Sequence, residues 1–192
     1  MNKLRHRVVY IPGLGDGADN GRSLALWFWR LFGVRADFVP MLWYDRESYE
    51  SKLEKVLGAI DHAEAKGYAV TLIGESAGGS MAINAAQARP SIRRLMTIAG
   101  ANDPGAKVSP VTLKRSPAFD WSMRSMKQSL GSFPASRTHT VRGMADHIVR
   151  TRHTVIKGAH NHTVPAVGHM MTIILCLTIF TPYIIWLVKK QD

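Results

Sequence analysis

The stretch Gly74-Glu75-Ser76-Ala77-Gly78-Gly79 decides the fold of this sequence. An apolar run at residues 68–73 precedes it and predicts a buried strand, and residues 81–88 after it predict a helix. A G-x-S-x-G pattern between a strand and a helix is typical of a tight turn that exposes a serine hydroxyl above the carboxyl end of a parallel sheet. The helix N-terminus there favours developing negative charge. We therefore predict that Ser76 is a nucleophile; the alternative interpretation is a glycine-rich and serine-rich turn without catalysis.

Strand and helix patterns alternate outward from this turn. Parallel strands need crossover connections, and right-handed crossovers build a doubly wound sheet. The sequence therefore predicts the α/β class, with about six mostly parallel strands and helices on both faces, in a single domain over residues 1–192. The other strands are expected at residues 7–11, 34–39, 94–99, 138–142 and 162–164, and the other helices at residues 23–32, 49–66 and 118–130.

Composition and charge exclude several classes of protein. The chain of 192 residues is 46% hydrophobic and 20% charged, which excludes general disorder. Its one cysteine, Cys176, excludes an intramolecular disulfide framework and a cysteine-based zinc site. The net charge of +11 is scattered along the chain, so we expect no nucleic-acid partner. The apolar run at residues 8–11 is too short for a secretion signal, so we expect a cytoplasmic location.

Acyl transfer at Ser76 needs two backbone donors for an oxyanion. The amide of Ala77, directly after the serine, is the first candidate. The second lies in the loop Pro12-Gly13-Leu14-Gly15 after the first strand, where glycines let the backbone approach a ligand closely. We assign it to the amide of Leu14. A phosphate-binding loop is the alternative, but the glycine spacing there is not G-x-G-x-x-G.

The nucleophile also needs a base and an acid that orients the base. His169 follows the last predicted strand, and Asp146 follows the strand at residues 138–142. Both would therefore lie at the carboxyl edge of the sheet, beside Ser76. Asp103 and Asp120 are weaker candidates for the acid because neither follows a late strand. The alternative interpretations are a helix-start histidine and a loop or helix-capping acid.

The sequence resembles the α/β-hydrolase superfamily, in particular minimal bacterial lipases and esterases without a lid. Residues 8–15, 72–79, 98–102 and 143–169 carry the resemblance, which covers most of residues 7–170. It implies a serine hydrolase that cleaves carboxylic esters through a Ser76-His169-Asp146 triad and an acyl-enzyme. It also implies a small-molecule ester as substrate and no cofactor.

Three departures leave the substrate less defined than the fold. Pro12 stands where the oxyanion loop of that family usually opens with histidine, and Asp16 replaces a frequent glycine. The sequence around Ser76 is more similar to carboxylesterases than to the small lipases. The alternatives are a thioesterase or acyltransferase, a non-catalytic binding protein with a hydrolase fold, and a membrane-tethered interaction protein with a vestigial triad.

Two other features carry weaker expectations. His160 and His162 alternate along a predicted strand and so share a face, but no third ligand accompanies them, and we predict no metal site. Residues 100–134 hold at most one predicted helix. We therefore expect an open site that accepts short to medium acyl chains.

Residues 170–188 contain no charged side chain and are long enough to span a membrane. The segment begins directly after His169, however, and Pro182 interrupts its hydrogen-bond ladder. We expect a very apolar final helix that packs on the sheet and presents its outer face to a membrane surface or to a second subunit. The alternative is a true membrane span. The expected location is therefore cytoplasmic, with membrane association through this segment.

Overall fold

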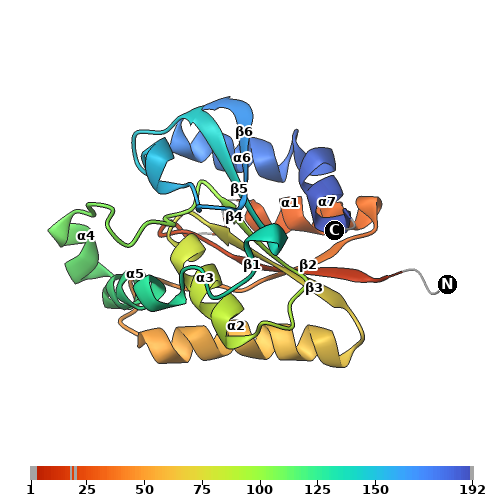
Figure 1. Ribbon diagram of the computed structural model, residues 1–192, viewed down its shortest axis with the longest axis horizontal. Coiled ribbons are helices and arrows are strands. Elements are labelled where there is room, and N and C mark those ends of the chain that lie inside the picture. Colours follow the sequence, from red (N-terminus) through yellow and green to blue (C-terminus); the bar gives the residue numbers. More distant parts are fainter. Residues whose placement is uncertain (1–3, 18, 20, 191–192) are drawn as a thin grey trace.

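The computed structural model describes residues 4–17, 19 and 21–190; residues 1–3, 18, 20, 191 and 192, which the predicted domain includes, lie outside the described residues. Six parallel strands form one sheet in the order β2-β1-β3-β4-β5-β6 (Figure 1). The predicted α/β class is confirmed. The strands are β1 (His6–Ile11), β2 (Arg35–Phe38), β3 (Ala69–Glu75), β4 (Arg94–Ile98), β5 (Thr138–Ala145) and β6 (His160–Val167).

Helices cover both faces of the sheet, as Figure 1 shows. One face carries α2 (Tyr49–Ala65), α3 (Gly78–Ala88) and α5 (Pro117–Ser129). The other face carries α1 (Arg22–Phe28), the 3-10 helix η1 (Trp29–Phe32), α6 (His169–Leu177) and α7 (Thr181–Lys189). This arrangement places every crossover on one face or the other, as a doubly wound sheet requires.

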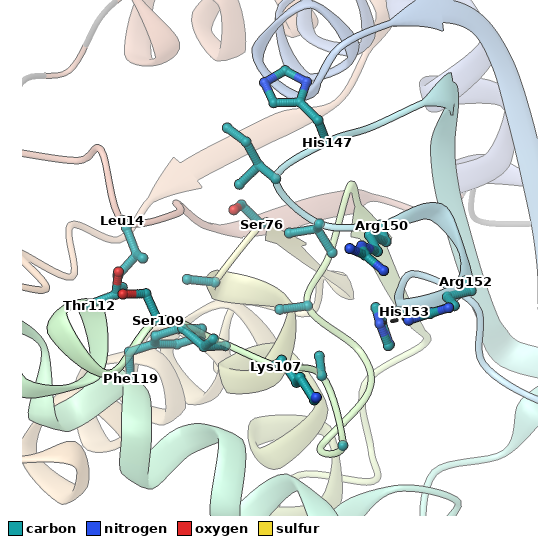
Figure 2. A pocket seen from close by; sticks show the side chains of 17 residues that line it. Leu14, Ser76, Lys107, Ser109, Thr112, Phe119, His147, Arg150, Arg152 and His153 are labelled. Atoms are coloured by element: carbon teal, nitrogen blue, oxygen red, sulfur yellow. Dashed lines mark hydrogen bonds between the residues drawn. The ribbon is translucent and has the colours of Figure 1, made fainter.

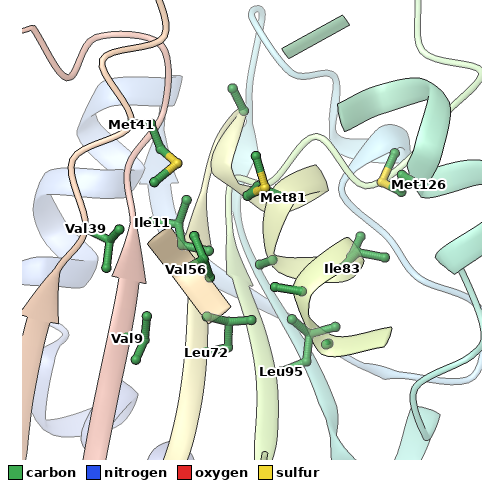
Figure 3. Close-up of a cluster of buried hydrophobic side chains, with 14 of the residues drawn as sticks. Val9, Ile11, Val39, Met41, Val56, Leu72, Met81, Ile83, Leu95 and Met126 are labelled. Atoms are coloured by element: carbon green, nitrogen blue, oxygen red, sulfur yellow. The ribbon is translucent and has the colours of Figure 1, made fainter. Parts of the chain in front are cut away.

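The two-residue repeat of the strands separates the apolar core into two clusters. Val9 and Ile11 of β1 point to the α2 and α3 face, where Val56 and Met81 pack against them (Figure 3). Tyr10, between them, points to the opposite face. Because successive strand residues alternate sides, one short apolar run supplies both cores.

Strands β5 and β6 are longer than predicted and end together. Their register pairs Ala145 with Val167. Asp146 directly follows β5, and His169 follows β6 after one glycine. The extra length of the two strands therefore brings both residues to the same edge of the sheet.

Two expectations about helices are wrong. Residues 100–134 contain two helices rather than one, because α4 (Pro110–Arg115) precedes α5. The segment 170–188 is not a single final helix either: α6 and α7 are bent by 69° at the break between them. Pro182 lies in the first turn of α7, where its missing N–H costs no helical hydrogen bond. Within the described residues, no single helix is long and apolar enough to cross a membrane.

Candidate active site

Ser76 lies in the turn between β3 and α3, in a left-handed backbone conformation with φ of 51°. A non-glycine residue adopts this conformation only where its surroundings hold it. The Ser76 N–H donates to the carbonyl of Ile98 at 3.0 Å, and the Ser76 carbonyl accepts from Gly79 and Ala101 at 2.9 and 2.8 Å. These bonds fix the strained residue above the carboxyl ends of β3 and β4.

The glycines around Ser76 are required by close backbone approaches. A Cβ on Gly74 would lie 2.4 Å from the Gly78 carbonyl oxygen, and a Cβ on Gly78 would lie 2.3 Å from the Ile11 carbonyl oxygen. Both distances are shorter than the contacts that Cβ atoms make in proteins, so a larger residue at either position would displace the backbone. The small residues two before and two after the serine thus let β1, β3 and α3 meet at the turn.

His169 connects the serine to a carboxylate. Its Nε2 lies 2.8 Å from Ser76 Oγ, and its Nδ1 lies 2.6 Å from Asp146 Oδ2. Asp146 Oδ1 accepts the backbone N–H groups of Ile148 and Val149 at 2.8 and 3.0 Å. Burial opposes ionisation of Asp146, but the hydrogen bonds from His169 and the two amides outweigh it and lower the pKa of the carboxyl. An ionised Asp146 accepts the Nδ1 hydrogen, which leaves Nε2 to accept from the serine hydroxyl.

Both predicted oxyanion donors lie beside the serine. Leu14 and Ala77 line the same cavity as Ser76. Across residues 4–17, 19 and 21–190, neither backbone N–H donates to a protein acceptor. Gly13 permits this approach, because a Cβ there would lie 2.7 Å from Ser76 Cβ. The arrangement leaves two N–H groups that a ligand oxygen can reach.

Sequence reasoning missed a buried ion pair beneath this loop. Glu75, next to the serine, receives two hydrogen bonds from the Arg22 guanidinium of α1, at 2.8 and 2.7 Å. It also accepts from the Tyr10 hydroxyl at 2.6 Å and from the Gly13 amide at 3.3 Å. Burial, together with the Glu75 carboxylate, raises the pKa of Tyr10 well above its ordinary value. The sequence signal for this ion pair was a glutamate at the end of an apolar strand, where a buried carboxylate needs a cationic partner.

Asp16 holds the oxyanion loop from the other side. Its buried carboxylate accepts the backbone N–H groups of Met41 and Leu42, each at 2.6 Å. The Trp43 indole N–H donates to the Pro12 carbonyl at 3.0 Å. The departure at Asp16 therefore joins the loop after β1 to the loop after β2.

A cavity of about 670 Å³ opens in front of Ser76. Leu14, Thr112 and Phe119 lie on one side of the serine, and Arg150 and His153 lie on the other (Figure 2). Helix α4, which the sequence did not predict, supplies Thr112. The size suits a small ligand.

The remaining candidate residues have other partners. Asp103 lies 2.5 Å from His153 Nδ1, and Asp120 pairs with Arg124. The ring of His139 stacks on those of His160 and His162, and a ring nitrogen of His139 lies 3.0 Å from one of His162. In the described part of the chain, no three potential ligands are placed to hold a metal ion.

Comparison with known proteins gives matches in structure alone. No family model and no curated protein matches the sequence. The chain is similar to a structure described under "LipS and LipT, two metagenome-derived lipolytic enzymes", with 13% identity, a TM-score of 0.69, and coverage of 97% of this chain and 95% of the other. It is similar to Est1E from Butyrivibrio proteoclasticus, with 16% identity, a TM-score of 0.69, and coverage of 97% and 90%.

A third similar structure is MGS-MChE2, described as an alpha/beta hydrolase enzyme from the metagenome of lagoon sediments at Mar Chica, Morocco. Identity is 17%, the TM-score is 0.64, and the alignment covers 93% of this chain and 88% of the other. At such identities the likeness concerns the fold. Together with the strand order and the turn that carries Ser76, it shows that the chain has the fold of the α/β-hydrolase superfamily.

Proposed function

We propose that the protein is a serine hydrolase that cleaves carboxylic esters through an acyl-enzyme. The hydrogen-bonded chain from Ser76 through His169 to Asp146 carries this proposal. Its members come from three separate connections of the sheet, and Ser76 lines the cavity. Nucleophile, base and orienting acid in this order are the parts that acyl transfer needs.

In the first half-reaction, Ser76 Oγ attacks the ester carbonyl carbon while His169 Nε2 takes the hydroxyl proton. The carbonyl oxygen becomes negative in the tetrahedral intermediate, and the amides of Leu14 and Ala77 stabilise it. The C–O bond to the alcohol then breaks. His169 returns its proton to the departing oxygen, and the acyl group remains on Ser76.

In the second half-reaction, water takes the place of the alcohol. His169 removes a proton from the water as its oxygen attacks the acyl carbon. The bond to Ser76 Oγ breaks, the serine regains a proton from His169, and the carboxylic acid leaves. Asp146 remains ionised throughout and stabilises the imidazolium that forms in each half.

A thioesterase or acyltransferase would use the same residues and differ only in the leaving group or in the acceptor. A non-catalytic binding protein would not need a serine hydroxyl on an imidazole nitrogen that a carboxylate orients from the other side. That hydrogen-bonded arrangement favours an enzyme, because it places a base at the serine hydroxyl.

A fluorophosphonate probe and a series of nitrophenyl esters of rising acyl length test the proposal together. We expect the probe to label Ser76 and not Ser109, the other serine of the cavity. Ser76→Ala should remove labelling and lower kcat for the best ester about a thousandfold or more. The fold should persist, because the substitution removes one oxygen atom.

Ser132→Ala is the matched control, since Ser132 is exposed and lies before the start of β5, at the edge of the sheet opposite to Ser76. It should keep wild-type labelling and turnover. Unchanged ester turnover in Ser76→Ala would refute the mechanism. The absence of both labelling and turnover in a folded wild-type protein would favour the binding protein.

A further inference from the structure

The cavity in front of Ser76 has a strongly cationic lining. Lys107, Arg150 and Arg152 line it, and no aspartate or glutamate is among its lining residues. Lys107 comes from the loop after β4, and the two arginines come from the connection between β5 and β6, with Arg152 in the 3-10 helix η3 (Thr151–His153). Three positive charges from two loops thus face a space with no negative charge in its wall (Figure 2).

Two of these cations have no protein counter-ion. Among the described residues, neither the Lys107 ammonium nor the Arg150 guanidinium has a hydrogen bond or ion pair with another side chain. Like charges that share a cavity repel one another. An anionic group on a ligand would therefore be attracted and would relieve that repulsion.

The third cation is held in position. Arg152 donates through Nε to His153 Nε2 at 3.1 Å, and His153 Nδ1 lies 2.5 Å from Asp103 Oδ2. The hydrogen bond to His153 uses only the Nε donor of the Arg152 guanidinium. The planar end of Arg152 keeps the paired N–H groups that bind a carboxylate or a phosphate through two bonds.

The loop that carries the arginines is anchored at both ends. At its beginning, the Asp146 carboxylate accepts hydrogen bonds from two backbone N–H groups. At its end, the Asn102 backbone N–H donates to the His153 carbonyl at 3.1 Å, and the Asn102 side-chain amide donates to the Thr154 carbonyl at 2.6 Å. Because Asp146 also holds His169, the same short loop connects the cations to the proposed base.

We propose that the preferred substrates are esters that carry an anionic group, a carboxylate or a phosphate, which Lys107, Arg150 and Arg152 bind. This inference rests on the proposed ester hydrolysis and specifies its substrate class. Arg152 is oriented by His153 and Asp103, so these two are positioning residues.

Matched ester pairs test the proposal. In one pair the acyl group carries the charge: nitrophenyl hydrogen glutarate against nitrophenyl pentanoate. In the other pair the leaving group carries it: the butyrate ester of 3-hydroxybenzoate against that of 3-methylphenol. We expect kcat/KM to favour the charged member of at least one pair by about tenfold or more, chiefly through KM, and the preference to fall as salt rises.

Variants assign the preference to the cavity. Arg150→Gln and Arg152→Gln should each reduce the ratio of charged to neutral kcat/KM by about tenfold. Lys66→Gln is the matched control: it removes one exposed positive charge at the end of α2, beside the start of β3 and so at the opposite edge of the sheet. The control should leave the ratio unchanged.

Equal kcat/KM values within both pairs would overturn the inference while leaving ester hydrolysis intact. A preference that survives both arginine variants would overturn it as well. Absence of turnover on all four esters, with no fluorophosphonate labelling, would refute the proposed function itself. The failures of the two proposals can thus be told apart.

A second, independent observation concerns the outer surface of α1, η1, α6 and α7. Apolar side chains that are 40% exposed or more gather on these four helices and on the break between α6 and α7. The four helices cover one face of the sheet (Figure 1). We name this surface the apolar face. Its members are Leu24, Trp27, Phe28, Leu31, Phe32, Met170, Met171, Ile174, Ile179 and Trp186.

The charged side chains within the four helices of the apolar face are all positive. None of the four helices contains an aspartate or glutamate. Arg30 lies 5.8 Å from the ring of Trp27, and Lys190 lies 5.6 Å from that of Trp186. A second copy of the chain would bring the same positive charges against these. An anionic lipid surface complements them, and tryptophan with lysine or arginine suits the headgroup region.

We propose that the apolar face binds the surface of an anionic bilayer without spanning it. Sedimentation with phosphatidylserine-containing vesicles should pellet the protein, and pure phosphatidylcholine vesicles should pellet it less. Leu31→Glu with Ile179→Glu should weaken binding about tenfold, because each adds a negative charge at a side chain that is 77% or 69% exposed.

Val111→Glu is the matched control, since Val111 is 65% exposed on α4, outside the apolar face. It should bind like the wild type. Absence of binding to either vesicle, with dimers that the double variant dissociates, would assign the face to a second copy and overturn the proposal. Retention of the protein in cell membranes after an alkaline carbonate wash would also overturn it, in favour of a span.

Discussion

Two histidine–aspartate pairs belong to this site and differ in the group that each imidazole faces: His169 bonds to Ser76, which lines the cavity, and His153 lines the cavity itself. His169 and Asp146 lie 2.6 Å apart, and His153 and Asp103 lie 2.5 Å apart. The Nε2 of His169 faces the Ser76 hydroxyl, whereas the Nε2 of His153 accepts from Arg152. An imidazole that faces a hydroxyl can remove a proton, while one that faces a guanidinium can only orient it.

The surroundings of the pairs differ as well. The side chains of His169 and Asp146 are 5% and 2% exposed, against 16% and 39% for His153 and Asp103. The pKa of each carboxyl is lowered, so ionisation alone does not distinguish a catalytic pair from a positioning pair. The group on the far nitrogen and the exclusion of water make that distinction.

The largest effect is expected when the pair of His169 and Asp146 is broken. His169→Ala should lower kcat about a thousandfold or more for every ester, because no base remains at the serine. His153→Ala should leave kcat close to the wild-type value and raise KM about tenfold or less, for charged esters only. Steady-state kinetics on the matched ester pairs measures both. A loss of kcat in His153→Ala that equals the loss in His169→Ala would mean that the second pair is catalytic too.

A smaller effect is expected from a substitution that displaces Ser76 and leaves the pair of His153 and Asp103 intact. Gly13→Ala would place a Cβ 2.7 Å from Ser76 Cβ and 3.2 Å from its Oγ, so the oxyanion loop or the serine must move. We expect kcat to fall roughly a hundredfold, the scale of one lost oxyanion donor, with the charged-to-neutral ratio preserved.

Gly17→Ala is the control for this change, since a Cβ there meets nothing within 4 Å. It should keep wild-type kcat. If Gly13→Ala also keeps wild-type kcat, the loop that carries Leu14 is not part of the catalytic machinery.

The smallest effect is expected in the way each histidine–aspartate pair changes the free energy of unfolding at acid pH. The folded-state pKa of each carboxyl lies below its ordinary value of 3.8, so each stabilises the fold above that pH and loses this contribution as pH falls through the lower folded value. Replacing either aspartate by asparagine removes its contribution, so the free energy of unfolding should fall less between neutral pH and acid pH. We expect this reduction to be larger for Asp146→Asn than for Asp103→Asn, because Asp146 is better buried. Urea unfolding midpoints at neutral pH and near pH 3 measure it. Equal reductions in the two variants would contradict the ranking.

The sequence was most informative where local chemistry decides structure. Residues 74–79 predicted the turn, and α2 begins at the expected residue, Tyr49, because Ser48 accepts the Ser51 amide at its N-cap. The positions of Asp146 and His169 followed from strand order alone, since parallel strands bring their carboxyl ends to one edge. Their roles stay predictions.

Contacts between distant segments could not be predicted in the same way. Glu75 and Arg22 are 53 residues apart, and only the packing of α1 on the sheet brings them together. The bend between α6 and α7 depends on the face that each helix buries, which an almost uniformly apolar sequence does not specify. Helix α4 is too short for helical periodicity to be recognised in it.

The Arg22–Glu75 pair has a consequence for local opening of the turn. Their side chains are 4% and 1% exposed, and separating them would leave an unpaired buried charge at a cost of about 3–5 kcal/mol. Such a cost opposes partial unfolding of the turn, and amide protons there should exchange with solvent chiefly through global unfolding. The amides of Ser76 and Ala101, which bond across this turn, should thus be among the slowest to exchange deuterium.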